Sequence, residues 1–380
     1  MRLLVISHTV HHRVGDRLVG WGPTVREIDH LAGLFEEIVH IAPVHAGAAR
    51  ASELPYRADN VRVVAVPPAG GASLRQKIDV LRVLPRYAGT IWKELRGCDV
   101  VHVRCPSNIG LVAVLLLIFR RRPPLRWIKY AGNWRPKGRE SWSYRLQRWI
   151  LDRRLTRSLV TVNGRWPNQP PHVRSFLNPG LTGEEFREGA AAAEQKSLSE
   201  PVRLLFVGRV DVEKGCGRSI EILVGLKARG VRAMLDVVGD GPDRRQFESQ
   251  AAAAGLGEWV HFCGWLPRQA LAGYYARAHF LLLPSSSSEG WPKVLSEGMA
   301  YGVVPLTSDV SSIPQLLASF RAGKALDAKD PEGFVEAIVG YVRNPDLWKT
   351  ESRNAAGAAK SFTYDAYLSA VRNLLDLEAA

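Results

Sequence analysis

Short runs of apolar, mostly β-branched residues recur along the first half of the chain, and helical stretches separate several of them. Such runs are typical of buried strands, and their alternation with helices predicts a parallel sheet. Ligands of such sheets bind at the carboxyl ends of the strands. The predicted strands are residues 2–8, 37–43, 60–67, 99–105, 125–132 and 158–164.

The same alternation returns between Val202 and about Asn344, which predicts a second Rossmann-like sheet. A chain of 380 residues is also too long for one ordinary core. A Gly-, Ala-, Ser- and acid-rich segment lies between the halves at 176–201, and an amphipathic pattern at 361–378 predicts a last helix. We therefore expect an α/β protein with domains at 1–180 and 201–360, a linker at 181–200 and a terminal helix at 361–380.

The cysteines and the apolar runs favour a cytoplasmic protein. No CxxC spacing is present, so the cysteines are expected to be free thiols in a reducing compartment. They are Cys98, Cys105, Cys216 and Cys263. The N-terminus is typical of a strand rather than a signal peptide. The longest apolar run, residues 109–119, is 11 residues long. It falls short of the ~20 residues that span a bilayer and predicts a buried helix.

The positive charge is concentrated in the first half. Residues 1–180 hold 29 Lys and Arg against 12 Asp and Glu, a net charge of +17, whereas the whole chain carries +14. The densest part, residues 120–157, interleaves arginines with aromatic residues, and Trp142 and Trp149 lie near helical spacing. Such a segment can lie on an anionic membrane surface. A packed helix with solvated arginines is the alternative. No recognition helix or RNA-binding motif supports nucleic acid as a partner.

Two glutamates, Glu289 and Glu297, lie eight residues apart in the segment 285–302. This segment follows an apolar run at 279–284, and Pro292 marks the start of a predicted helix. A loop and a helix N-terminus after a strand form an anion site. Acids on either side of that site suit the hydroxyl groups that flank a diphosphate, as in a nucleotide sugar. A solvated helix face is the alternative for the bare pair.

Two cations, Arg209 and Lys214, follow the predicted strand at 204–208. Cations at this place can neutralise the charge that grows on a leaving diphosphate, and Arg offers a planar fork for phosphate oxygens. The glycines of the next turn, Gly239 and Gly241, are followed by Pro242, so the third glycine of a dinucleotide fingerprint is missing.

Together these segments resemble the signature of the family 4 retaining glycosyltransferases, which have the GT-B fold. The resemblance implies two Rossmann-like domains whose parallel sheets face each other across a cleft, with a C-terminal helix that crosses back to the first domain. It implies that Glu289 contacts the donor sugar, that Glu297 contacts the ribose, and that Arg209 and Lys214 hold the diphosphate. The remaining donor-binding candidates are Gly208, Lys293, Val294, Gly241, Cys263 and Trp265.

The first half departs from the family pattern. Where the family has a double glycine, this chain has Gly20, Trp21 and Gly22, and Gly22 is the candidate for close approach to donor or acceptor. Where the family often has a histidine, the segment 129–134 has none, and Asn133 is the candidate to bond a sugar hydroxyl. No metal or other cofactor is expected, and a metal site at His8, His11 and His12 is not favoured because no acidic motif accompanies them.

The sequence thus predicts a retaining hexosyltransferase that moves a sugar from a nucleotide-sugar donor to an acceptor hydroxyl. The expected acceptor is a lipid-linked or membrane-bound intermediate of polysaccharide or glycoconjugate synthesis. We expect the protein to be peripheral on the inner face of the cell membrane. A nucleotide-sugar epimerase on the same fold, or a non-catalytic sugar- or membrane-binding protein, are the alternatives.

Overall fold

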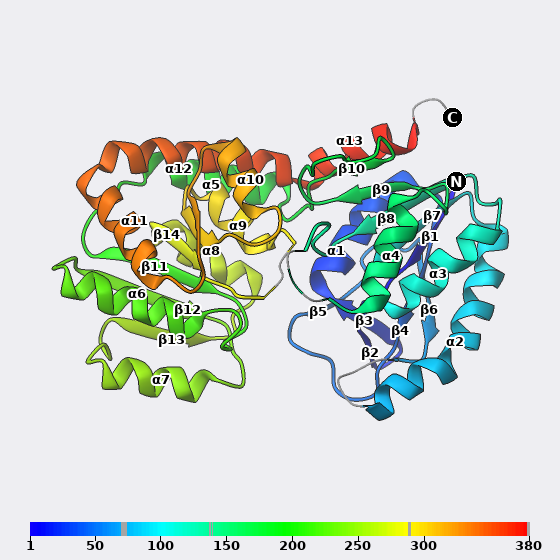
Figure 1. Ribbon diagram of the computed structural model, residues 1–380, viewed down its shortest axis with the longest axis horizontal. Coiled ribbons are helices and arrows are strands. Elements are labelled where there is room, and N and C mark those ends of the chain that lie inside the picture. The colour runs from blue at the N-terminus through cyan, green and yellow to red at the C-terminus, as the bar shows by residue number, and fades with distance from the viewer. Residues whose placement is uncertain (70–73, 137, 139, 288–289, 378–380) are drawn as a thin grey trace. The chain divides into compact units, whose positions relative to one another are not determined.

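The computed structural model describes residues 1–380 except 70–73, 137, 139, 288–289 and 378–380, and it describes no side chains for 74–81. The chain forms two compact units (Figure 1). The first comprises Met1–Phe176 and Leu368–Ala380, and the second comprises Leu177–Tyr367. The last helix, α13 (Tyr364–Leu375), therefore begins in the second unit and ends in the first.

The first unit is built on a parallel sheet of seven strands in the order β10-β9-β8-β7-β1-β4-β6. Its strands are β1 (Arg2–Ile6), β4 (Glu37–Pro43), β6 (Val61–Val66), β7 (Val100–Cys105), β8 (Leu125–Tyr130), β9 (Leu159–Val162) and β10 (Val173–Ser175). The first six confirm the predicted strands. The short β10, with the sequence Val-Arg-Ser, has too few apolar residues to be recognised.

A small antiparallel sheet was not predicted, because its strands are only three to five residues long. It contains β2 (His11–Val14), β3 (Arg17–Trp21) and β5 (Glu53–Pro55). β3 leads directly into helix α1 (Gly22–Leu31). This hairpin therefore determines where α1 begins.

Helices cover both faces of the first sheet. One row of paired strand residues, Ile41, Ile6, Val103, Ile128 and Val160, lies on one face. This row shares a core with the buried sides of α2 (Leu74–Glu94), α3 (Asn108–Phe119) and α4 (Trp142–Asp152). α1 packs on the other face, because its Glu27 contacts Arg104 and Lys129 of β7 and β8. The helices α2, α3 and α4 thus form one layer whose outer side points away from the sheet.

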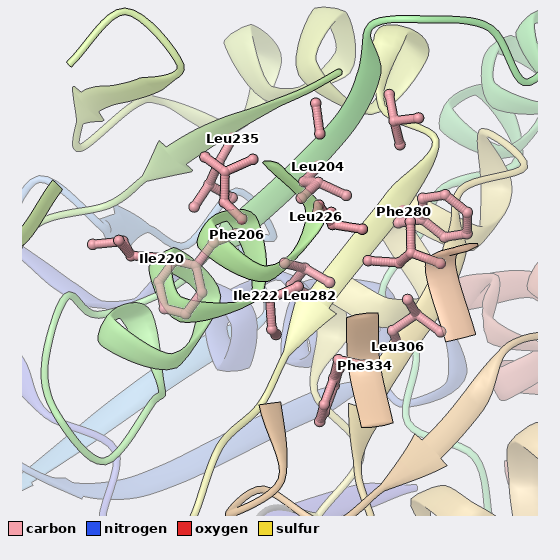
Figure 2. Close-up of a cluster of buried hydrophobic side chains, with 14 of the residues drawn as sticks. Leu204, Phe206, Ile220, Ile222, Leu226, Leu235, Phe280, Leu282, Leu306 and Phe334 are labelled. Carbon is pink, nitrogen blue, oxygen red and sulfur yellow. The ribbon is translucent and has the colours of Figure 1, made fainter. Parts of the chain in front are cut away.

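The second unit has a parallel sheet in the order β13-β12-β11-β14-β15-β16. Its strands are β11 (Val202–Val207), β12 (Ala233–Val238), β13 (Val260–Gly264), β14 (Phe280–Leu283), β15 (Val304–Ser308) and β16 (Lys324–Leu326). Figure 2 shows its core, in which Leu204, Leu235 and Phe280 of the sheet lie with Leu226 and Phe334 of the surrounding helices. Two parallel sheets in separate units confirm the predicted α/β class.

The helices of the second unit correct one expectation about the linker. They are α5 (Gly183–Gln195), α6 (Cys216–Ala228), α7 (Arg244–Ala253), α8 (Arg268–Arg277), α9 (Lys293–Ala300), α10 (Ile313–Phe320), α11 (Pro331–Arg343) and α12 (Pro345–Ala359). Residues 181–200, expected as a linker, hold α5. Thr182 and Glu185 form a reciprocal capping box at its start, and a run of alanines favours the helix.

Within the described residues, no helix has both the length and the apolar character needed to cross a membrane. The apolar segment 109–119 forms α3, a helix of 12 residues that starts with a side-chain cap from Ser107.

Candidate functional site

The loop after β11 carries the two predicted cations at the carboxyl edge of the second sheet. The side chain of Arg209 is 62% exposed and pairs with Asp211, whose other carboxylate oxygen accepts the backbone N–H of Lys214 at 2.7 Å. Asp211 itself is buried. Asp211 thus holds this loop in a defined shape. The sequence signal that was missed is an Asp whose side chain caps a turn three residues on.

Glycines let three loops meet at this edge. A Cβ atom at Gly239, whose φ is +138°, would lie 1.8 Å from the carbonyl oxygen of Gly208. A Cβ atom at Gly241 would lie 2.2 Å from the carbonyl oxygen of Val210. Gly215, with φ of +87°, approaches the carbonyl oxygen of Pro284 in the same way. The loops after β11, β12 and β14 are therefore packed backbone against backbone, which only glycine permits.

The loop after β14 is also hydrogen-bonded to the cation loop. The backbone N–H of Ser286 donates to the carbonyl of Glu213 at 2.8 Å, and the Arg218 guanidinium donates to the carbonyl of Pro284 at 2.6 Å. This segment leads towards Glu289, which lies outside the described residues. After it α9 begins, with Pro292 as its N-cap and with Lys293 and Val294, both half-buried, in its first turn.

Glu297 of α9 is 6% exposed and is held by two residues of α8. One carboxylate oxygen pairs with Arg268, and the other accepts the hydroxyl of Tyr275 at 3.0 Å. Burial and the charge of Glu297 raise the pKa of the Tyr275 phenol well above its ordinary value. The phenol therefore stays a hydrogen-bond donor to the carboxylate.

Arg268 joins Glu297 to a wider network. It donates to the carboxylate of Glu185 in α5 at 2.8 and 3.1 Å and to the carbonyl of Gly180 at 2.6 Å. Burial alone would lower the pKa of Arg268, but the charges of Glu297 and Glu185 raise it above the ordinary value. Sequence reasoning missed Arg268, Tyr275 and Glu185, although the spacing of seven between Arg268 and Tyr275 places both on one side of a helix.

The remaining donor-binding candidates lie near the end of β13. Cys263 is half-buried, and Trp265 is exposed. Between them Gly264 accepts the backbone N–H of Gly239 at 2.8 Å, which ties this strand end to the glycine turn after β12. The structure thus brings Gly208, Gly241 and the end of β13 into adjoining loops.

In the first unit, Gly22 begins α1, and its backbone N–H donates to the carbonyl of Ser52 at 2.9 Å. A Cβ atom there would lie 2.7 Å from that oxygen, so the close approach to β5 requires a glycine. The side chain of Asn133 accepts the backbone N–H of Arg135 at 3.0 Å and is half-buried.

Of the histidines near the first strand, His8 is exposed, whereas His11 and His12 are buried and hydrogen-bonded. Both ring nitrogens of His11 are engaged, one with the carbonyl of Thr9 at 2.8 Å and one with the hydroxyl of Tyr56 at 2.9 Å. His12 contacts Glu53 at 2.7 Å. The described part of the chain holds no group of three or more His, Cys, Asp or Glu that could bind a metal ion.

A charged cluster beneath α1 was not predicted. The carboxylate of Glu27, 1% exposed, accepts from Arg104 at 2.9 Å and from Lys129 at 2.8 Å. Burial lowers the pKa of Lys129 to about 8, although Glu27 opposes this shift. The two cations are paired neighbours on β7 and β8, so one glutamate from α1 serves both.

Comparison with sequence families finds a match within the second unit. Residues 190–360 match the family described as glycosyl transferases group 1. The amylovoran biosynthesis glycosyltransferase AmsK of Erwinia amylovora is 31% identical over 151 residues, 38% of this chain and 36% of that protein. The GDP-mannose-dependent alpha-(1-6)-phosphatidylinositol dimannoside mannosyltransferase of Mycobacterium tuberculosis is 31% identical over 176 residues, 46% of this chain and 44% of that protein. The chain thus spans less than half the length of these two relatives.

Solved structures resemble the chain over nearly its whole length. Sucrose-phosphate synthase from Thermosynechococcus elongatus has a TM-score of 0.72 at 18% identity and covers 98% of both chains. Alr3699/HepE of Anabaena, crystallised with UDP, has a TM-score of 0.71 at 14% identity and covers 99% of this chain and 100% of that one. At these identities the likeness concerns the fold alone.

Proposed function

We propose that this chain, a GT-B protein whose residues 190–360 belong to the glycosyl transferases group 1, transfers a sugar from a nucleotide donor to an acceptor hydroxyl. One observation carries the proposal. Within the matched segment, the loop with Arg209 and Lys214 is hydrogen-bonded to the loop that leads to the two glutamates. Cations and a helix N-terminus at one sheet edge suit a diphosphate.

Arg209 and Lys214 would bind the diphosphate and stabilise the negative charge that grows on it as the glycosidic bond breaks. Asp211 would support them, because it orients Arg209 and fixes the backbone at Lys214. The exposure of Arg209 leaves its guanidinium accessible to a ligand. The UDP found in the structure of Alr3699/HepE supports a nucleotide as the leaving group.

Glu297 would accept ribose hydroxyls, as the family resemblance implies, and Glu289 would contact the sugar. Each oxygen of Glu297 already accepts one donor, and a carboxylate oxygen has capacity for a second. By the same resemblance the anomeric configuration is retained and no metal takes part. The leaving phosphate would help to take the proton from the acceptor hydroxyl.

The acceptor we propose is a lipid-linked or membrane-bound intermediate of polysaccharide or glycoconjugate synthesis, reached from the cytoplasmic face of the membrane. The names of two relatives support this class, since one acts in amylovoran biosynthesis and the other on a phosphatidylinositol dimannoside. The net charge of +17 over residues 1–180 is suited to an anionic membrane surface.

Nucleotide binding tests the proposal directly. We expect UDP, GDP or ADP, or a sugar derivative of one of them, to raise the melting temperature, and one base to be preferred. A matched pair of variants distinguishes an effect at the site from a general effect of surface charge. The pair is Arg209→Ala in the cation loop and Arg232→Ala at the opposite end of the sheet. Arg232 is exposed and pairs only with Glu200 among the described residues. The proposal fails if no nucleotide shifts the transition, or if both variants respond alike.

Incubation with the preferred donor alone separates transfer from epimerisation. A transferase releases product at an appreciable rate only when acceptor is added. An epimerase converts the donor sugar without one, and that result would replace the transfer reaction with the alternative.

A further inference from the structure

Helix α4 carries a stripe of four residues, Trp142, Arg145, Leu146 and Trp149, at positions i, i+3, i+4 and i+7. Leu146 is half-buried against the core, whereas the other three are exposed on the outer side. The indoles of Trp142 and Trp149 are 70% and 51% exposed, whereas Leu151 on the opposite side is buried in the core. Two exposed tryptophans on one stripe of a helix are uncommon on the surface of a soluble protein and indicate an interaction site.

This stripe lines a pocket of about 450 Å³, together with Arg135, Arg148 and Asp152. We call it the α4 pocket. Three guanidinium groups therefore face one carboxylate. Arg148 is already neutralised by a two-point contact with Glu140, and Arg135 lies 3.8 Å from Asp152. Arg145 is exposed and has no carboxylate partner within the described part of the chain. Arg145 is thus the cation of the pocket that is available to a ligand, and it lies on the helix between Trp142 and Trp149.

The neighbouring helix α3 extends the apolar surface. It belongs to the same layer as α4 and lies next to it (Figure 1). Leu115 and Phe119, one helical turn apart, are exposed, and Phe119 is 84% exposed at the end of the helix. Arg120 then stacks on Trp92 at 4.1 Å, and Arg121 and Arg122 follow, both exposed. Basic and large apolar side chains thus alternate across the outer side of this layer.

We propose that the α4 pocket binds the phosphate of an anionic lipid headgroup, with Arg145 as its principal cation and Trp142 and Trp149 at the level of the headgroups. Guanidinium forks bind phosphate oxygens in two-point contacts. Indoles prefer the boundary between headgroups and acyl chains, and Leu115 and Phe119 supply apolar area for that boundary. This inference rests on the membrane-bound acceptor proposed above, and it adds the place and the chemistry of the contact.

A phosphate bound in this pocket could belong to a lipid headgroup or to a soluble molecule. The surrounding exposed apolar side chains favour the lipid, because a soluble ion gains nothing from Trp142, Trp149 or Phe119. A soluble phosphate would need only the arginines. The two sources therefore differ in whether the tryptophans contribute to binding.

Flotation with vesicles tests the proposal on the whole 380-residue chain without donor or acceptor. Phosphatidylglycerol vesicles should bind the protein at 0.15 M salt, and binding should fall sharply by ~1 M because the Debye length shrinks to ~3 Å. Arg145→Glu should weaken partitioning by roughly thirtyfold, since it changes two charges at the surface. Arg353→Glu, at an exposed position of α12 in the second unit that forms no ion pair among the described residues, is the charge-matched control and should bind as the unaltered protein does.

The aromatic contribution is measured separately. The single variants Trp142→Ala and Trp149→Ala should each weaken vesicle binding severalfold, while the circular dichroism spectrum and the melting temperature stay unchanged. Glycerol 1-phosphate at millimolar concentration should compete only weakly. Equal binding to phosphatidylcholine, equal loss in the Arg353→Glu control, or full competition by glycerol 1-phosphate would each overturn the lipid assignment. Displacement of the vesicles by an oligonucleotide at equal phosphate concentration would overturn it too.

Failure of this inference and failure of the transfer reaction give different results. Arg145→Glu should retain the nucleotide-induced rise in melting temperature, and Arg209→Ala should retain vesicle binding. Vesicle binding without any nucleotide response would contradict the proposed function alone. A nucleotide response without vesicle binding would contradict the α4 pocket alone.

Discussion

The hydroxyl of Tyr275 lies 3.0 Å from one carboxylate oxygen of Glu297, and it donates a hydrogen bond across the interface of α8 and α9. Arg268, two helical turns earlier on α8, holds the other oxygen. The carboxylate that the family resemblance assigns to the ribose is therefore fixed in orientation before any nucleotide arrives. Positions fixed in this way bind at a lower entropic cost than mobile ones.

We predict that Tyr275→Phe weakens the binding of the preferred nucleoside diphosphate by about tenfold. The hydrogen bond to a charged group is lost, and such bonds contribute ~1.5–3 kcal/mol. Titration calorimetry with the ribonucleotide and with its 3′-deoxy analogue checks this. The variant should lose affinity mainly for the ribonucleotide, and an equal loss for both would show that Tyr275 has only a structural role.

Substitutions of Glu297 and Glu289 should have different effects. Glu297→Ala should weaken nucleoside diphosphate binding by roughly 10- to 100-fold, because the ribose hydroxyls lose a charged acceptor. Glu289→Gln should depress turnover and largely spare that affinity. Calorimetric titration beside initial rates measures both. If Glu289→Gln loses the nucleotide and Glu297→Ala does not, the two roles are reversed.

Arg209→Ala and Lys214→Ala should each lower turnover by about 10²- to 10³-fold, the usual effect of removing one donor that stabilises charge in the transition state. Their melting temperatures should stay near that of the unaltered protein, because Arg209 is exposed and Lys214 is half-buried. Arg232→Ala provides the control for surface charge. Near-normal turnover in both loop variants would remove the diphosphate assignment.

Gly239→Ala should destabilise the protein and abolish nucleotide binding. Its φ of +138° and the distance of 1.8 Å from a new Cβ to the Gly208 carbonyl leave no room for a side chain. Gly230→Ala is the matched control, because Gly230 also has a positive φ, +75°, but meets nothing within 4 Å. The control should lose only the ~1–3 kcal/mol typical of backbone strain. Urea unfolding of both variants measures the free energy of unfolding, which should be clearly higher for Gly230→Ala than for Gly239→Ala.

Lys129 predicts a specific pH dependence of stability. Its pKa is lowered to about 8 in the folded protein, whereas an unfolded lysine has a value near 10.5. Between these values the unfolded chain binds more protons than the folded one, so the contribution of Lys129 to stability rises as pH rises from about 8 to 10.5. The gain is on the order of 3 kcal/mol. The free energy of unfolding of the Lys129→Gln variant, measured across this range, should lack that rise. Parallel curves of stability against pH for the two proteins would contradict the shifted pKa.

The main strands were predictable because each is a compact run of apolar residues that needs only local pattern to be recognised. α5 was missed for the opposite reason. Its alanines and acids have the composition of a linker, and only the reciprocal bonds of Thr182 and Glu185 mark its start. The predicted cation loop depended on spacing along the chain, and the structure adds Asp211 as the group that holds it.

The network around Glu297 could not have been predicted from its own segment. Arg268, Tyr275 and Glu185 lie 29, 22 and 112 residues away in sequence, and only the packing of α5, α8 and α9 brings them together. The same holds for Glu27, which meets Arg104 and Lys129 from sequence distances of 77 and 102 residues. Charged residues on helices are expected to be solvated unless their partners are known.

The glycines that interlock the loops after β11, β12 and β14 also constrain how this protein could be altered by evolution or by an engineer. Since Gly239, Gly241 and Gly215 press directly on the backbone of a neighbouring loop, an insertion in one loop would displace the others. Exposed side chains beside this frame, such as Trp265, carry no such restriction. Under the proposed function, a change of nucleobase preference is therefore easier to reach through single substitutions around these loops than through changes in loop length.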